Sequence, residues 1–246
     1  MSAEQQRGAR IAPAPATQLP LGVQLRDEAT FAGFEPGDNG AAVAWLQARI
    51  GAGPERGWLW GRPESGRSHL LQASCRLAVD AGQRAIYLTP DVIRPAPQAA
   101  LEGLEQCALV ALDDLGELAG ERAVEVALFD LCNRISERGG LLLLAADAAP
   151  LSYHWTLPDL ASRLAAAAVF RLRPLSDQDK MAALQRRASL RGIELPLRTA
   201  EFILGRADRS PRALFALLDT LDTASLAAQR RLTVPFVREV LAQGEA

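Results

Sequence analysis

The sequence predicts an α/β protein in which helices cover both faces of a parallel sheet, followed by a small all-helical domain. Two patterns predict this fold. After Gly57 short apolar runs alternate with longer amphipathic runs, and past Pro174 only helix signals remain. Continuous apolar strands separated by helices are typical of parallel sheets buried on both faces. The length of 246 residues and the apolar content of 49% fit such a domain with a smaller companion.

Each predicted element follows from a local pattern. Apolar runs predict strands at 58–60, 85–88, 109–112, 141–145 and 169–172, and amphipathic runs predict helices at 68–80, 122–137 and 159–166. In the helical domain Ser176, with Asp179 three residues later, predicts a helix start, and Gly192 predicts the end of that helix. Ser210 before Pro211 predicts a second start, because proline favours the first helical position.

Charge and cysteine content limit the class of protein. The net charge is −2, but residues 171–246 hold 13 basic and 9 acidic side chains, so only this end is basic. Cys75, Cys107 and Cys132 lie in apolar stretches without metal-ligand spacing, which predicts buried thiols in a reducing compartment. The apolar runs are much shorter than the about 20 residues that span a bilayer, and residues 1–17 lack a signal core. We expect a cytoplasmic protein.

The strongest chemical signal is a turn between a predicted strand and a predicted helix, Gly61-Arg62-Pro63-Glu64-Ser65-Gly66-Arg67-Ser68. In a phosphate loop, glycines let backbone N–H groups and the helix N-terminus face an anion, and a serine hydroxyl can ligate magnesium. We therefore expect Gly61, Ser65, Gly66, Arg67 and Ser68 to hold nucleotide phosphates. Arg67 stands where such loops have lysine, and it keeps the charge in a broader planar group. The alternative is an ordinary glycine-rich turn.

Two carboxylates, Asp113 and Asp114, follow the strand predicted at 109–112. A carboxylate at the C-terminal end of a strand beside a phosphate loop is where such proteins hold Mg²⁺ and its water. Asp113 and Ser68 are therefore the predicted magnesium ligands. Asp114 occupies the place that many ATPases give to a catalytic glutamate, and its shorter side chain would hold an attacking water differently. We expect slow autonomous hydrolysis; the alternative is an aspartate pair that caps a turn.

Further segments indicate which family of nucleotide-binding proteins the chain resembles. They are residues 29–34 with 37–39, the run Leu157-Pro158-Asp159-Leu160-Ala161-Ser162-Arg163-Leu164, residues 175–177 and residues 208–215. With the two motifs above they resemble the DnaA branch of the AAA+ family, and most closely the Hda family of DnaA-related regulators, over about residues 18–242. The resemblance implies an AAA+ nucleotide-binding domain at 26–174 with a P-loop parallel sheet, and a helical lid domain at 175–246. It also implies bound ADP or ATP with Mg²⁺.

The resemblance also implies roles for single residues. Arg163 would be an arginine finger that stabilises charge on the γ-phosphate of a nucleotide bound by a neighbouring subunit. Arg212 would reach this chain's own nucleotide, and Asp147 would be a polar group near the γ-phosphate. His69 lies in the first turn of the phosphate-loop helix and is expected to support the nucleotide site. The plainer alternatives are two surface arginines and an aspartate in a strand-end turn.

Near the start, Gln18-Leu19-Pro20-Leu21-Gly22 resembles the peptide by which replication proteins bind the sliding clamp. Such a peptide needs a glutamine amide and spaced aliphatic side chains, here Gln18, Leu19 and Leu21. We expect residues 18–25 to bind the clamp and residues 1–17 to form a mobile leader that lets them reach it. The alternative is that the peptide packs on the chain itself.

The function implied is negative regulation of the initiation of DNA replication. With the DNA-loaded clamp, the β subunit of DNA polymerase III, the chain would stimulate ATP hydrolysis by DnaA, without being an enzyme in its own right. DNA would be reached through the clamp, no membrane is involved, and a homodimer is a further expected assembly. No base-reading helix-turn-helix domain is expected after the lid. The alternatives are an autonomous ATPase, a loader or adaptor that uses nucleotide as a switch, and a family member that keeps only the fold.

Overall fold

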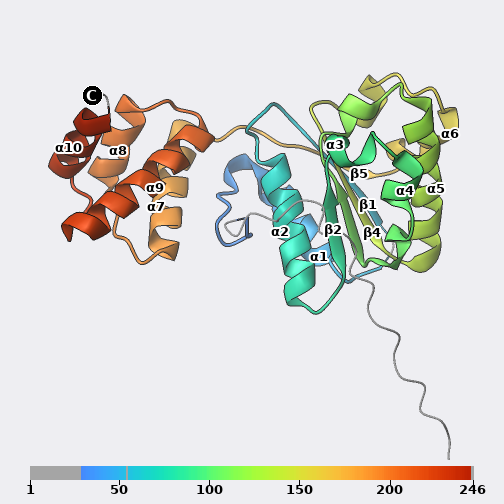
Figure 1. The fold of residues 1–246 in the computed structure, drawn as a ribbon, viewed down its shortest axis with the longest axis horizontal. Helices are drawn as coiled ribbons and strands as arrows, with labels where there is room; N and C mark the ends of the chain where they lie inside the picture. The colour runs from blue at the N-terminus through green and yellow to red at the C-terminus, as the bar shows by residue number, and fades with distance from the viewer. Residues whose placement is uncertain (1–28, 54, 245–246) are drawn as a thin grey trace, which may run out of the picture.

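The computed structural model describes residues 29–53 and 55–244, which form a sheet domain and a helical domain (Figure 1). The sheet is parallel with the strand order β2-β3-β4-β1-β5. Its strands are β1 (Glu55–Trp60), β2 (Ala85–Leu88), β3 (Leu109–Leu112), β4 (Leu141–Ala146) and β5 (Ala168–Arg171). The predicted α/β class with a helical companion is confirmed, and each predicted strand overlaps an observed one.

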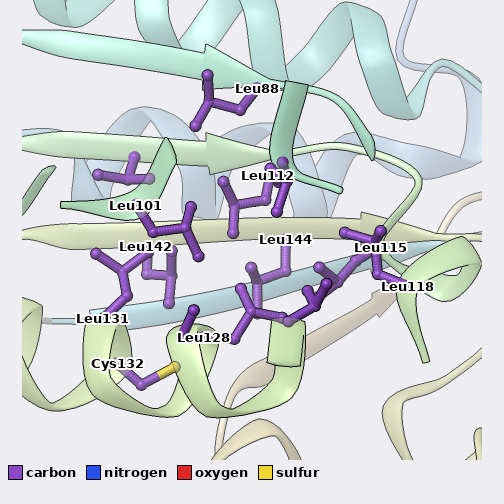
Figure 2. Packing of buried hydrophobic residues seen from close by; sticks show 14 of the residues in the cluster. Leu88, Leu101, Leu112, Leu115, Leu118, Leu128, Leu131, Cys132, Leu142 and Leu144 are labelled. Carbon is purple, nitrogen blue, oxygen red and sulfur yellow. The ribbon is translucent and has the colours of Figure 1, made fainter. Parts of the chain in front are cut away.

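Helices cover both faces of this sheet because its central strands are apolar on both sides. Leu142 and Leu144 of β4 point into one core with Trp58, whereas Leu141 and Leu143 point into the other. The first core is closed by α3 (Pro90–Ile93), α4 (Pro97–Leu101), α5 (Arg122–Arg138) and α6 (Pro158–Ala165), and the second by α1 (Gly40–Arg49) and α2 (Arg67–Asp80). Figure 2 shows the leucines of β3, β4 and α5 that interlock in the first core.

The helical domain consists of α7 (Asp177–Leu190), α8 (Leu197–Arg206), α9 (Pro211–Ala228) and α10 (Val234–Gly244), which enclose a core of their own. Both predicted helix starts are present. The Ser176 side chain accepts from the Asp179 backbone N–H in a reciprocal capping box, and the Ser210 hydroxyl accepts from the N–H of Ala213. Gly192, with φ of +74°, follows the end of α7 as predicted.

Asn39 ties the two domains together at their joint. It is buried at 4% exposure, its amide donates to the Arg173 carbonyl at 2.9 Å, and its Oδ1 accepts from the Arg173 N–H at 2.8 Å. Arg173 lies between β5 and the helical domain. A second link is the ion pair of Arg186 on α7 with Glu35 at 3.0 Å. Residues before α1 therefore hold both the chain that leads into the helical domain and its first helix.

The cysteines Cys75, Cys107 and Cys132 are buried free thiols, as predicted. Cys75 belongs to the core beneath α2, and the other two belong to the core beneath α5. Within 29–53 and 55–244, the helices are all too short or too polar to cross a bilayer. The leader at 1–17 and the clamp peptide with Gln18, Leu19 and Leu21 lie outside the described residues.

Candidate nucleotide-binding site

The loop from Gly61 to Gly66 joins β1 to α2, and its glycines leave room for nothing larger. A Cβ on Gly61 would lie 2.5 Å from the Leu172 carbonyl oxygen. A Cβ on Gly66, whose φ is +95°, would lie 2.6 Å from the ring of Phe34. Glu64 also has a positive φ, of 65°, which is unusual for a residue with a side chain. The loop is therefore held in a tight, special backbone conformation.

This loop presents groups that suit a phosphate. The first helical hydrogen bond of α2 runs from the Leu70 N–H to the Gly66 carbonyl, so the N–H groups before it are available at the helix N-terminus. Ser65 is 5% exposed, and its buried Oγ has no hydrogen-bond partner among the described residues. A buried hydroxyl without a partner is costly unless a ligand completes it. The residues present therefore fit a nucleotide phosphate.

The magnesium-site candidate Asp113 is held rigidly at the end of β3. It is 1% exposed, its Oδ2 accepts from the Tyr87 hydroxyl at 2.6 Å, and its Oδ1 accepts from the Asp114 backbone N–H at 2.9 Å. Burial of the phenol, and next the charge of Asp113, raise the pKa of Tyr87, so its proton stays in place as a donor. Sequence reasoning missed Tyr87; a polar aromatic residue near the end of an apolar strand was the only available signal.

Arg67 forms an ion pair with Asp114, with Nη2 3.0 Å from Oδ1 and only 11% of the arginine side chain exposed. Burial, and next the charge of Asp113, raise the pKa of the Asp114 carboxyl, whereas Arg67 lowers it. The arginine at the lysine position thus contacts the second acidic residue, which would hold an attacking water in an active ATPase. A bound phosphate competes with Asp114 for this guanidinium.

Asp147 lies in the turn that follows β4, where its carboxylate accepts a hydrogen bond from the Tyr153 hydroxyl. The same hydroxyl accepts from the Ala148 N–H at 3.0 Å. Burial, and next the hydrogen bond to Asp147, raise the pKa of Tyr153 to about 12. Asp147 contributes to the electrostatic environment of Asp114, so it belongs to the same edge of the sheet. The turn role fits this geometry, and the placement of Asp147 near the γ-phosphate stays a prediction.

A cleft of about 630 Å³ opens between the phosphate loop and the helical domain. Its walls include the loop, Phe34 before α1, and Arg212 and Phe215 of α9. The predicted residues that line it are Ser65, Gly66, Arg67, Ser68, His69 and Arg212. His69 Nε2 lies 2.9 Å from the Thr30 carbonyl oxygen, and its ring packs 5.3 Å from that of Phe34. His69 thus joins the loop helix to the wall of the cleft.

The helical domain adds a basic residue that sequence reasoning missed, Arg187 of α7. It lines the cleft, and its guanidinium lies 4.7 Å from the centroid of the Phe215 ring. Burial lowers its pKa, and the nearby Asp219 opposes that shift. Its position within an ordinary polar stretch of α7 gave no sign of this role. Arg187 and Arg212 supply positive charge opposite the phosphate loop.

No group of three or more potential metal ligands occurs among residues 29–53 and 55–244. The candidates Ser68 and Asp113 would therefore bind Mg²⁺ together with nucleotide phosphates and water, as the ion prefers. ADP or ATP would be held by the loop and by Arg212. When bound, the nucleotide would supply the phosphate charge that these basic groups and Mg²⁺ neutralise.

Arg163 lies outside this cleft. It is on α6, and its guanidinium stacks 5.3 Å from the centroid of the Phe129 ring of α5. The start of α6 is fixed by Glu125, a carboxylate with 0% exposure. This carboxylate accepts hydrogen bonds from the N–H groups of Gly120, Thr156 and Leu157 and from the Thr156 hydroxyl. The candidate finger is thus presented on a fixed helix, away from the chain's own cleft.

Comparison with known proteins finds a family match for the lid and structures that share the fold of the chain. Residues 177–241 match the Hda lid domain family. Domain III of the replication initiation protein DnaA from Thermotoga maritima has the same fold, with a TM-score of 0.71, 20% identity, and coverage of 90% of this chain and 98% of that chain. AMPPCP-bound DnaA from Aquifex aeolicus gives a TM-score of 0.67 at 19% identity, with coverage of 80% and 66%. The Thermotoga maritima RuvB Holliday junction branch migration motor gives 0.61 at 16%, with coverage of 87% and 73%. This chain therefore shares the fold of DnaA domain III.

Proposed function

We propose that this chain negatively regulates the initiation of DNA replication. Two findings support the proposal: residues 177–241 match the Hda lid domain family, and the fold is that of DnaA domain III. The chain binds ADP or ATP with Mg²⁺ in its own cleft and stimulates ATP hydrolysis by DnaA. The observation that carries the proposal is the placement of Arg163. It lies on a helix fixed by a buried carboxylate and does not line the chain's own cleft.

The chemistry belongs to the partner. DnaA holds the ATP, and Arg163 of this chain places a guanidinium beside the γ-phosphate, where negative charge develops during hydrolysis. Removing a single preorganised donor of this kind costs about 10²–10³ in rate. Glu125 keeps the segment before α6 in one position, so the arginine meets the partner already oriented.

The chain's own nucleotide serves mainly to join its two domains. Gly61, Ser65, Gly66 and Ser68 hold the phosphates, while Arg212 and Arg187 reach the cleft from the lid. Asp113 and Ser68 take the ion. Two features support slow turnover here: Arg67 is paired with Asp114, and both oxygens of Asp113 already accept hydrogen bonds. As long as Arg67 and Asp114 stay paired, neither residue takes part in ATP hydrolysis.

The clamp peptide with Gln18, Leu19 and Leu21 would recruit the chain to the DNA polymerase III sliding clamp on DNA, within the cytoplasm at the replisome. Recruitment restricts the activity to replicated DNA, because both the clamp and DnaA must be present. A homodimer that covers Arg163 or the peptide would be a resting form of the same protein.

The test is ATP hydrolysis by DnaA with this protein added, with and without DNA-loaded clamp. Stimulation should require both partners and should fall at least tenfold in Arg163→Ala. Arg138→Ala is the matched control, since Arg138 is exposed at the far end of α5 and should keep full stimulation. Full stimulation by Arg163→Ala would refute the trans-acting role.

A second candidate is an autonomous ATPase, favoured by the phosphate loop and by the lid arginine Arg212 across the cleft, although Arg67 at the lysine position counts against it. It predicts steady turnover by the protein alone, unchanged by DnaA or clamp. A switch-type adaptor instead predicts partner recruitment that survives Arg163→Ala. The same assay, run without partners and followed by a pull-down of DnaA, separates these functions.

A further inference from the structure

The arginines of the lid fall into two groups. Five have acidic partners among the described residues: Arg186 with Glu35, Arg187 with Asp219, Arg191 with Asp219 and Asp222, Arg209 with Asp177, and Arg230 with Glu239. Arg198, Arg206, Arg231 and Arg238 form no ion pair with any residue that the structure describes, and all are exposed. Arg212 in the nucleotide cleft aside, the unpaired charge of the lid is therefore concentrated on α8, on α10 and on the residues just before α10.

These arginines do not scatter over the surface. Arg198, Phe202 and Arg206 follow one another at intervals of four residues, so they form one stripe along α8. The guanidinium of Arg206 lies 5.7 Å from the Phe202 ring centroid, and that of Arg238, from α10, lies 5.6 Å from the same ring. We call these four residues the basic stripe.

The ring of Phe202 has a structural effect on the two arginines. Stacking on an aromatic face holds a guanidinium in place while its N–H edge stays free to donate. Ordering two long side chains in advance lowers the entropy that a partner would otherwise have to overcome. Nearby acids do not cancel the charge. Glu239 is paired with Arg230 at 2.8 Å, and Glu201, three residues after Arg198 on α8, forms no ion pair with it.

The spacing of the stripe suits a phosphate backbone. Eight residues separate Arg198 from Arg206, which is about 12 Å along a helix. Measured along the duplex axis, this length corresponds to between three and four phosphates of one DNA strand, whose axial rise is about 3.4 Å each. Guanidinium groups bind phosphate oxygens in a bidentate manner. Figure 1 shows α8 and α10 at the end of the lid that faces away from the sheet domain, and the three arginines of the stripe are exposed.

We propose that the basic stripe of Arg198, Phe202, Arg206 and Arg238 binds the phosphate backbone of duplex DNA directly. The contact is independent of sequence, since it involves no base edge, and it is weak, as expected of three cations. It adds a second attachment to DNA beside the one made through the clamp. Because both act on the same DNA molecule, the two attachments reinforce each other by effective concentration.

The experiment measures binding of a short fluorescein-labelled DNA duplex to the full chain by anisotropy, without clamp or DnaA. Three phosphate contacts predict that log Kd changes with log salt with a slope near 2.7, so affinity falls about 40-fold between about 50 and 200 mM NaCl. Arg206→Ala/Arg238→Ala should weaken binding at least tenfold and lower the slope by about 2. Arg198→Ala alone should lower it by about 1.

The matched control is Arg173→Ala/Arg209→Ala, which removes the same charge from two exposed arginines that are ion-paired with Asp38 and Asp177. Circular dichroism should give all variants the same melting midpoint. Equal weakening by the control and the stripe variant would overturn the proposal, as would unchanged DNA affinity. A separate titration with isolated clamp would also overturn it if the stripe variant bound the clamp more weakly while its DNA binding was unchanged. That result would assign the stripe to an acidic protein surface. None of these results bears on Arg163, because DnaA is absent.

Discussion

At the scale of single residues, the acidic part of the site consists of side chains held by hydrogen bonds and by an ion pair. Asp113 has 1% exposure, and it keeps its orientation because Tyr87 and the Asp114 N–H bind its two oxygens. Arg67 and Asp114 likewise hold each other. A nucleotide phosphate that competes with Asp114 for Arg67 has to break this existing contact, and the loss of the contact reduces the net binding free energy.

Gly66→Ala should abolish measurable nucleotide binding, because the added Cβ would lie 2.6 Å from Phe34 at a φ of +95°. The left-handed backbone alone costs about 1–2 kcal/mol, and the clash adds to it. A fluorescent nucleotide titration and urea unfolding measure the two effects. Gly120→Ala is the control: its φ is +88° with no atom within 4 Å, so it should lose some stability and keep the affinity. Equal affinity loss in both variants would contradict a local steric effect.

Sequence reasoning predicted the residues whose chemistry lies in a motif, such as Ser65, Ser68 and Asp113, and the structure brings them to one edge of the sheet. It missed Tyr87 and Arg187, since each reaches the site by the packing of an element without any motif. Tyr87 lies near the end of an apolar strand and Arg187 lies in a polar helix, and no local pattern distinguishes either residue from others in such elements.

At the scale of elements, the buried carboxylate of Glu125 couples α5 to α6. Four donors converge on it from the loop before α5 and the segment before α6. Burial raises its pKa, but the hydrogen bonds from Thr156, Gly120 and Leu157 lower it, and the net shift is downward. The ionised form is therefore the one that the fold stabilises.

Glu125→Gln should destabilise the chain at neutral pH by about 3 kcal/mol, because the amide cannot accept all of these bonds. With a folded pKa below the ordinary 4.5, the carboxylate contributes fully above pH 4.5 and loses its contribution as the pH falls through the folded pKa. Urea unfolding at pH 7 and at successively lower pH should show the two proteins converging in acid. A constant difference would rule out the ionised carboxylate as the cause.

The elements themselves differed in how far they could be predicted. The run Leu141–Ala146 is apolar throughout, so β4 was predicted to within one residue. β1 begins at Glu55, three residues before its predicted start, because its first residues are polar although the strand pairs with β4. α1 (Gly40–Arg49) was not predicted, because its alanines and glycine do not separate clearly into an apolar and a polar face. Its position is set by packing on β1.

At the scale of the whole molecule, the joint between the domains decides whether the lid can contribute to the cleft. Asn39 binds both backbone groups of Arg173, and Arg186 of α7 pairs with Glu35. These contacts join residues far apart in the sequence, which is why the domain order could be predicted but the joint could not. The Asn39 side chain acts where the chain leaves the sheet.

Asn39→Ala should loosen the lid and weaken nucleotide binding about tenfold, since two buried hydrogen bonds are lost and two backbone groups become unsatisfied. Asn39→Asp should be intermediate, because it still accepts from the Arg173 N–H but no longer donates to the carbonyl. Nucleotide titration and the rate of tryptic cleavage at Arg171, which unlike Arg173 is not followed by proline, provide the measurements. Wild-type cleavage and affinity in Asn39→Ala would show that the joint is held elsewhere.

The three buried thiols can report when the core of the sheet domain opens. All lie in the sheet domain, on both sides of the sheet, and burial raises the pKa of Cys75 to about 12 and that of Cys132 to about 11. Alkylation near neutral pH thus proceeds only during moments when the surrounding core parts. Timed alkylation read by mass spectrometry would report each side of the sheet separately. The lid has no cysteine, so alkylation would report the opening of the sheet domain alone and would not respond to movement of the lid.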